Sequence, residues 1–207
     1  MPPGLPTPLR LKAENLNCER GGRLVFKNLS FELGAGELAE LRGPNGAGKS
    51  SLLRLLAGLN MSTTGSLRLE GGATDTSLGE QSHYIGHTEA NKPALTVREN
   101  LIFWQKFLGG AENTKIFSAF NLETLSDDQA LLLSAGQKRR LALTRLFVAH
   151  RPLWLLDEPT IGLDAASLLI LQNHIRNHLK NGGMVIAATH TELGIKSARN
   201  IQLGQVV

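Results

Sequence analysis

The chain has 207 residues, of which 42% are hydrophobic and 19% are charged, so it is long enough to bury one sizeable core. Its 22 Lys and Arg against 18 Asp and Glu give a net charge of +4 without long runs of like charge. This balance favours an ordinary solvated surface over a nucleic-acid-binding one. The single cysteine, Cys18, excludes an intrachain disulfide, suits a reducing compartment and is expected to be a small packed side chain.

The two membrane-related signals that a sequence can carry are both missing. Residues 1–8 are rich in proline and have no basic region followed by an apolar block, so they predict a flexible tail rather than a secretory signal. No apolar run reaches 18 residues, so no membrane-spanning helix is predicted. A cytosolic protein is therefore expected.

The first third of the chain predicts strands, then a glycine-rich turn, then a helix. Apolar residues alternate with polar ones around Phe31 and Leu33 and again around Leu67 and Leu69, which predicts an antiparallel element. Residues 37–41 predict a strand that leads straight into the turn. Leucines at positions 52, 53, 55, 56 and 59 then repeat at helical spacing.

The rest of the chain predicts helices first and further strands later. Residues 88–145 have a helical pattern, clearest over 97–108, and are expected to form a helical subdomain inserted in the core. Residues 154–156 and 184–188 predict strands. The helix between them carries an apolar face and ends at Gly182-Gly183; the face consists of Leu168, Leu171, Ile175 and Leu179. This alternation is typical of an α/β domain with a mainly parallel sheet, present as one copy.

Residues 43–50 fit the phosphate-loop pattern, in which two glycines flank four residues and Lys and Ser follow. Glycines let backbone N–H groups turn inward around phosphates, and the start of the next helix adds partial positive charge. Lys49 is expected to reach the β- and γ-phosphates and Ser50 to ligate Mg²⁺. The alternative is a glycine turn that merely joins strand to helix. The predicted nucleotide-binding residues here are Gly43, Pro44, Asn45, Gly46, Ala47, Gly48, Lys49, Ser50 and Ser51.

The strand predicted over residues 154–156 ends in two acids, Asp157 and Glu158. We expect Asp157 to hold Mg²⁺ through water and Glu158 to polarise the attacking water. On an extended backbone the two side chains would point in opposite directions, which suits distinct roles. The alternative is a solvated acidic turn.

Residues 133–137 closely resemble the signature sequence of ATP-binding cassette (ABC) ATPases, which has a second glycine where this chain has Ala135. A serine hydroxyl and small-residue amides at a helix N-terminus can bind an anion. In the family, this site meets the γ-phosphate bound by the other protomer, which would assign that role to Ser134, Ala135, Gly136 and Gln137. The alternative is a helix cap and nothing more.

Further matches follow in family order. Residues 162–164 resemble the loop after the catalytic acid, which would place Asp164 at the dimer contact, and Thr189-His190 resembles the switch histidine. His190 follows an apolar strand, where a neutral imidazole could bond the γ-phosphate or fix the attacking water, although a lone histidine is often structural. The resemblance covers nearly the whole chain. It implies one P-loop NTPase domain over 1–207, with a RecA-like parallel-sheet core, N-terminal antiparallel strands and a short helical subdomain.

Besides Ala135, two positions depart from the family pattern. The family glutamine that contacts Mg²⁺ and water falls at His87, counted back from residues 96–101. Histidine is a softer ligand for a hard cation, so a water-mediated or membrane-coupling role is expected, with a structural histidine as the alternative. The aromatic residue that usually stacks on adenine is replaced by Arg20, whose guanidinium plane could stack on a base or lie on the surface.

The resemblance implies ATP and Mg²⁺ as ligands and a homodimer, because each composite site needs two copies. Residues 18–20, Gly86-His87 and residues 133–143 resemble the ATP-binding subunits of bacterial cytochrome c maturation systems. That likeness implies a peripheral subunit on the cytoplasmic face of the inner membrane. It would work with integral membrane subunits, energising haem export or release of a haem-loaded chaperone.

Other assignments remain open. The chain has no Cys-x-x-Cys-His pattern, so any haem is expected to be handled by partners. One alternative is the ATPase subunit of another ABC importer or exporter, whose cassette chemistry would be identical. The other is a soluble ABC ATPase acting on nucleic acid or ribosomes, although such proteins usually carry two cassettes or long insertions. No direct contact with nucleic acid is expected.

Overall fold

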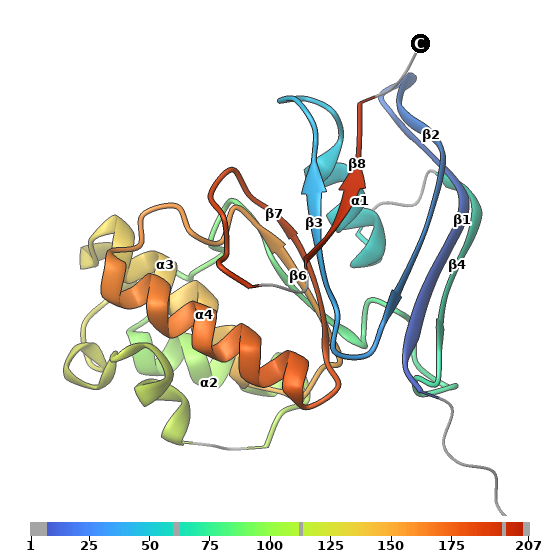
Figure 1. Ribbon diagram of the computed structural model, residues 1–207. Coiled ribbons are helices and arrows are strands. Elements are labelled where there is room, and N and C mark those ends of the chain that lie inside the picture. The colour runs from blue at the N-terminus through green and yellow to red at the C-terminus, as the bar shows by residue number, and fades with distance from the viewer. Residues whose placement is uncertain (1–7, 60–62, 112–113, 196–197, 205–207) are drawn as a thin grey trace, which may run out of the picture.

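The protein is described by a computed structural model that covers residues 8–59, 63–111, 114–195 and 198–204. The predicted tail lies outside the described residues, apart from Pro8. Figure 1 shows a parallel sheet in the middle of the molecule, with helices α2, α3 and α4 on one side. Helix α1 and an antiparallel sheet lie on the other side. The layers follow the α/β pattern expected from the sequence.

The antiparallel sheet has the strand order β2-β1-β4 in the described part of the chain. Its central strand places Ala13 between Phe31 on one neighbour and Leu67 on the other. This pairing confirms the predicted antiparallel element. Cys18 is buried on the same strand, as expected. The strands are β1 (Arg10–Arg20), β2 (Arg23–Gly34) and β4 (Thr63–Glu70).

The second sheet is parallel throughout, with the order β5-β6-β7-β3-β8 among the described residues. Every residue of β6 and β7 is buried, which explains why both strands are apolar throughout except for Asp157 at the end of β6. The strands are β3 (Leu38–Arg42), β5 (Ser82–Ile85), β6 (Leu153–Asp157), β7 (Met184–Ala188) and β8 (Ala198–Gln202). The strands predicted over 37–41, 154–156 and 184–188 are confirmed, whereas β5 and β8 were not predicted.

The predicted helices form at the expected places, with one difference. Leu59 lies outside the first helix and is 62% exposed, because that helix ends at Leu56. The predicted helix over 97–108 is confirmed, and Thr96 and Glu99 cap it reciprocally. The α-helices are α1 (Lys49–Leu56), α2 (Val97–Phe107), α3 (Ala135–Thr144) and α4 (Ala165–Lys180). Short 3₁₀ helices are η1 (Thr114–Phe120), η2 (Glu123–Leu125), η3 (Ala130–Leu132) and η4 (Arg145–Phe147).

Side chains of the parallel sheet alternate between two cores. Leu155 and Ile186 pack with α1 and the antiparallel sheet, whereas Leu156 and Val185 pack with the helices on the opposite face. Burying each such side chain contributes about 1.5–3 kcal/mol. With both faces covered, the carboxyl edge of the sheet is the place where polar loops can gather.

Candidate functional site

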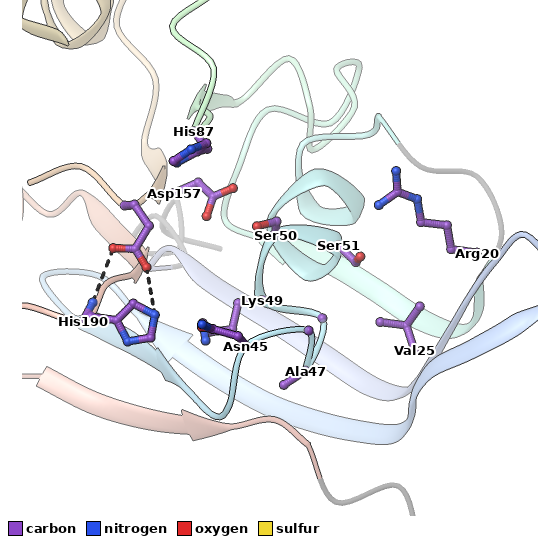
Figure 2. A pocket seen from close by; sticks show the side chains of 13 residues that line it. Arg20, Val25, Asn45, Ala47, Lys49, Ser50, Ser51, His87, Asp157 and His190 are labelled. Atoms are coloured by element: carbon purple, nitrogen blue, oxygen red, sulfur yellow. Dashed lines mark hydrogen bonds and ion pairs between the residues drawn. The ribbon is translucent and has the colours of Figure 1, made fainter. Parts of the chain in front are cut away.

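A cavity of about 440 Å³ lies at the carboxyl edge of the parallel sheet. Loops that follow β3, β5, β6 and β7 all reach it. Its lining residues are Arg20, Val25, Asn45, Gly46, Ala47, Gly48, Lys49, Ser50, Ser51, His87, Asp157, Glu158 and His190. Figure 2 shows Arg20 and Val25 at one end and His87, Asp157 and His190 at the other. The structure therefore brings together the residues predicted for nucleotide binding and hydrolysis, except Gly43 and Pro44, and it adds Val25.

The phosphate loop needs glycine at two positions where the backbone packs closely. Gly43 and Gly48 have φ values of 143° and 97°, which other residues rarely adopt. A side chain at Gly43 would overlap the carbonyl oxygen of Leu203, and one at Gly48 would overlap Val25. The loop thus packs between β2 and Leu203, the residue that follows β8, and Gly43 is not part of the cavity lining.

Helix α1 begins at this loop with its first amides uncapped. Its N-cap residue is Gly48, no side chain caps it, and its first turn carries no acid. The first N–H groups of such a helix have no partner within it and attract anions. The Lys49 ammonium folds back over the loop and donates to the carbonyls of Gly43 at 2.7 Å and Pro44 at 3.2 Å. The cradle is chemically suited to phosphate.

Asp157 ends β6 and is only 3% exposed. The Tyr84 hydroxyl donates to Asp157 Oδ2 at 3.5 Å, and Arg54 Nε donates to the Tyr84 oxygen at 3.4 Å. Burial raises the pKa of Tyr84. Sequence reasoning missed Tyr84, whose only signal was its place two residues before Gly86-His87.

Glu158 does not continue the strand, which corrects the extended backbone expected from the sequence. Its φ is 49°, in the left-handed region, and its N–H donates to the carbonyl of Ala188 at 2.7 Å. A backbone turn, and not strand alternation, therefore separates its carboxylate from that of Asp157. The Glu158 carboxylate accepts from the His190 N–H at 3.4 Å and lies 3.5 Å from His190 Nε2 (Figure 2).

The residues of the predicted signature lie outside this cavity. Ser134 caps α3: its hydroxyl accepts from the Gln137 N–H at 3.3 Å, and Gln137 Oε1 accepts from the Ser134 N–H at 2.7 Å. Ser134 and Ala135 are exposed. A Cβ at Gly136 would lie 2.8 Å from the carbonyl oxygen of Gly162, so glycine permits a close approach between these loops.

Asp164 also lies outside the cavity, where it caps α4. It accepts from the Ser167 N–H at 2.7 Å, and that bond lowers the pKa of the Asp164 carboxyl. Arg139, to which we assigned no role from the sequence, is buried on α3 behind the two acids.

The donor set fits a magnesium ion, because Ser50 and Asp157 offer the hard oxygens that Mg²⁺ prefers. Among the described residues, no group of three or more His, Cys, Asp or Glu side chains could hold a metal. Mg²⁺ in nucleotide sites usually takes one or two protein ligands and fills the rest with phosphate and water. Within the described ranges, no helix has the length and apolar character needed to cross a bilayer.

Comparisons with curated proteins give close relatives over nearly the whole chain. It is 48% identical over 198 residues to the cytochrome c biogenesis ATP-binding export protein CcmA of Nitrobacter winogradskyi, covering 95% of this chain and 98% of that one. The protein of the same name from Rhodopseudomonas palustris strain BisB18 is 50% identical with the same coverage. That from Brucella abortus strain 2308 is 48% identical, covering 92% of this chain and 89% of that one.

Solved structures and the family pattern agree with these relatives. The ATP-binding subunit of an ABC transporter superposes with a TM-score of 0.81 at 22% identity, covering 93% of this chain and 87% of that one. A putative ABC transporter ATP-binding protein from Pyrococcus furiosus gives 0.76 at 19%, covering 93% and 97%. Both likenesses confirm the predicted fold class. Residues 26–161 match the family described as ABC transporter. The chain therefore belongs to the ABC transporter family, as an ATP-binding protein similar to those of cytochrome c biogenesis.

Proposed function

We propose that this chain is the ATP-hydrolysing subunit of a membrane complex that serves c-type cytochrome biogenesis. The observation that carries the proposal is the similarity to cytochrome c biogenesis ATP-binding export proteins, which are 48–50% identical over 95% of this chain. The cavity at the carboxyl edge of the parallel sheet would bind and hydrolyse ATP. The complex would energise haem export or the release of a haem-loaded chaperone at the cytoplasmic face of the inner membrane. Haem itself would be handled by the partners.

Nucleotide binding is assigned to the phosphate loop and its helix. The uncapped amides of α1 would receive the phosphates, and Lys49 would exchange its two backbone carbonyls for phosphate oxygens. Ser50 and Asp157 would hold Mg²⁺, which neutralises phosphate charge when bound. Arg20, at the far end of the cavity, would stack on adenine.

Hydrolysis is assigned to the pair of side chains at the ends of β6 and β7. Glu158 would orient a water molecule and accept its proton as the water oxygen attacks the γ-phosphorus, while the bond to the β,γ-bridging oxygen breaks and ADP leaves with that oxygen. His190 lies within 3.5 Å of that carboxylate, so its imidazole can hold Glu158 in place or reach the γ-phosphate. The buried Asp157 would hold the metal and is assigned no part in proton transfer.

Two copies of the chain would complete the sites. Ser134, Ala135, Gly136 and Gln137 do not line the cavity of their own chain, and we propose that they contact the nucleotide of a second copy. Asp164 would lie at the contact between the copies. The proposed assembly is a homodimer with two shared ATP sites.

An apolar groove supports a membrane partner. A second cavity of about 410 Å³ lies between β5, helix α2 and the segment that follows α1, and Leu59 and Phe107 are exposed on its walls. Within the described residues, Trp104 Nε1 is buried there without a hydrogen-bond partner. An amphipathic segment of an integral membrane subunit that carries an acceptor for this N–H fits such a groove. Gly86 and Thr88 also line it, so His87 would connect the partner to the ATP site.

Deletion of the gene in the source organism tests this proposal. C-type cytochromes should disappear from membranes, and the wild-type chain should restore them. The Glu158→Gln chain should fail to restore them although it still binds ATP, because the amide keeps the shape of the side chain and loses the base. Unchanged cytochromes in the deletion strain would favour another ABC transporter. Failure of the tagged chain to co-purify with any integral membrane protein would favour a soluble ABC ATPase.

A further inference from the structure

Arg139 makes an unusual set of contacts for a buried arginine. It lies on α3 and is 3% exposed. Its Nη1 donates to the carbonyl of Gly86 at 2.9 Å, and its Nη2 donates to those of Asp157 at 2.9 Å and Glu158 at 2.6 Å. Its Nε donates to the carbonyl of Pro159 at 3.4 Å. The guanidinium thus binds backbone on two separate segments.

These carbonyls belong to the loops that carry the proposed catalytic groups. Gly86 follows β5 and precedes His87, whereas Asp157 and Glu158 mark the end of β6. The two strands are parallel neighbours, with Ile85 paired to Leu156. Arg139 therefore bridges their carboxyl ends at the level where the sheet stops.

The left-handed turn at Glu158 explains why a bridge is needed there. A non-glycine residue at a φ of 49° persists only where its surroundings hold it. Successive carbonyls around this turn converge on the guanidinium and leave the sheet ladder. Without the guanidinium of Arg139, the carbonyls of Asp157 and Glu158 would lose hydrogen bonds that the neighbouring strands do not replace.

The charge of Arg139 suits this position as well. Burial lowers the pKa of its guanidinium, whereas the charges of Glu89, Asp157 and Glu158 act in the opposite direction. Arginine keeps its proton more firmly than any other side chain. A planar fork of five donors can also serve several carbonyls at once, which a lysine ammonium on a flexible stem cannot do in this geometry.

We propose that Arg139 is a positioning residue that fixes the turn carrying Glu158 and the loop carrying His87, and ties both to helix α3. The inference rests on the hydrolytic role proposed for Glu158. Helix α3 begins directly after Ser134, which is proposed to contact the nucleotide of a second copy. Arg139 therefore connects this helix to Glu158, which is proposed to act on the chain's own nucleotide.

The test compares Arg139→Gln and Arg139→Lys with a matched control, Lys138→Gln, which removes the same charge from the preceding residue of α3. The full chain is used throughout, and turnover at saturating Mg-ATP is measured together with the ATP dissociation constant. Both Arg139 variants should lose about 10- to 100-fold in kcat, because small misplacements of a catalytic group are that costly. Their ATP affinity should stay near wild type, since the phosphate loop is untouched. Lys138→Gln should match wild type in both measurements.

Several outcomes would overturn the inference. Full kcat in Arg139→Lys would show that charge alone matters, and equal losses of affinity and kcat would indicate general damage to the site. Thermal melts identify variants that do not fold; if neither Arg139 variant folds, the residue serves core stability alone. A parallel Glu158→Gln chain separates the two proposals. Wild-type turnover in Glu158→Gln would reject Glu158 as the catalytic base. Loss of turnover in Glu158→Gln, together with normal kcat in Arg139→Gln, would reject only the role of Arg139.

Discussion

Helices α1 and α3 both begin at predicted anion sites, yet their N-termini are built differently. The first amides of α1 have no side-chain cap, since Gly48 stands at the N-cap. In α3, two N–H groups at this end are already used, because Ser134 and Gln137 cap each other's backbone N–H groups. The start of α1 carries no side-chain cap, whereas the start of α3 is partly capped by its own side chains.

The difference sets the order in which the two termini can act. An anion at α1 displaces water and the contacts of Lys49 with two carbonyls. An anion at α3 must replace cap bonds, which contribute about 0.5–2 kcal/mol. We therefore expect α1 to bind ATP by itself and α3 to engage ATP only when a second copy presents it.

Removing the cation at α1 should have the largest effect. In Lys49→Ala, ATP binding should weaken at least about tenfold and turnover should vanish, because one charged hydrogen bond to phosphate contributes about 1.5–3 kcal/mol. Titration calorimetry with ATP and a phosphate-release assay measure both quantities. Lys138→Ala, which removes a cation outside the cavity, is the control. Turnover near wild type in Lys49→Ala would refute the phosphate-loop assignment.

Blocking the start of α3 should separate binding from turnover. Ser134→Arg should keep ATP affinity, because its own cavity is intact, and should lose turnover, because a bulky side chain faces the second copy. Mixing Ser134→Arg with Lys49→Ala chains should restore partial activity, since each mixed dimer holds one site with both lesions and one with neither.

The interpretation of that mixture depends on showing that mixed dimers form, which two different affinity tags allow. If mixed dimers are present and remain inactive, the sites are not shared or must act together. Loss of ATP binding by Ser134→Arg monomers would contradict the difference between α1 and α3 directly.

Opening the cap of α3 should have a smaller effect. Gln137→Ala removes the acceptor for the Ser134 N–H, so the free energy of unfolding should fall by about 1 kcal/mol. Urea unfolding measures this change. ATP affinity of the chain should not change, because Gln137 lies outside its own cavity. An equal loss in Lys138→Ala would mean that truncation of any side chain in this turn, and not loss of the cap, is responsible, because alanine itself favours the helix.

The cap of α4 should give the smallest effect, visible only in acid. The Ser167 N–H lowers the pKa of Asp164, so its ionised form stabilises the fold above the ordinary pKa of aspartate and this contribution disappears as pH falls through the lowered value. Stability of the wild type should therefore decline more steeply than that of Asp164→Asn on acidification below about pH 4. Thermal melts from pH 6 to pH 3 test the difference. If the stability of the two proteins declined in parallel as pH falls, the charge of Asp164 would not contribute to this cap.

The sequence predicted those parts whose physics is local. Strands β6 and β7 are continuous apolar runs, and the phosphate loop has residue types that few other structures require. Strand β5 was missed because it contains the polar residue His83. The His83 ring is buried, with a ring nitrogen 2.7 Å from the carbonyl oxygen of Ala149. Burial lowers the pKa of His83 to about 4. The turn at Glu158 was missed because residue type does not reveal the sign of φ. Arg139 was missed because its partners are backbone carbonyls, which leave no pattern in the sequence.

The contact between Gly43 and Leu203 has a consequence for how the protein is made. The phosphate loop leaves the ribosome early, but the strand that supports it, β8, is synthesised more than a hundred residues later. Leu203 also donates its N–H to the carbonyl of Arg42 at 2.8 Å, directly before the loop. Since ligands stabilise only states that bind them, ATP stabilises those chains whose synthesis has passed residue 203. Shorter nascent chains must therefore hold their first core together without this contribution from ATP.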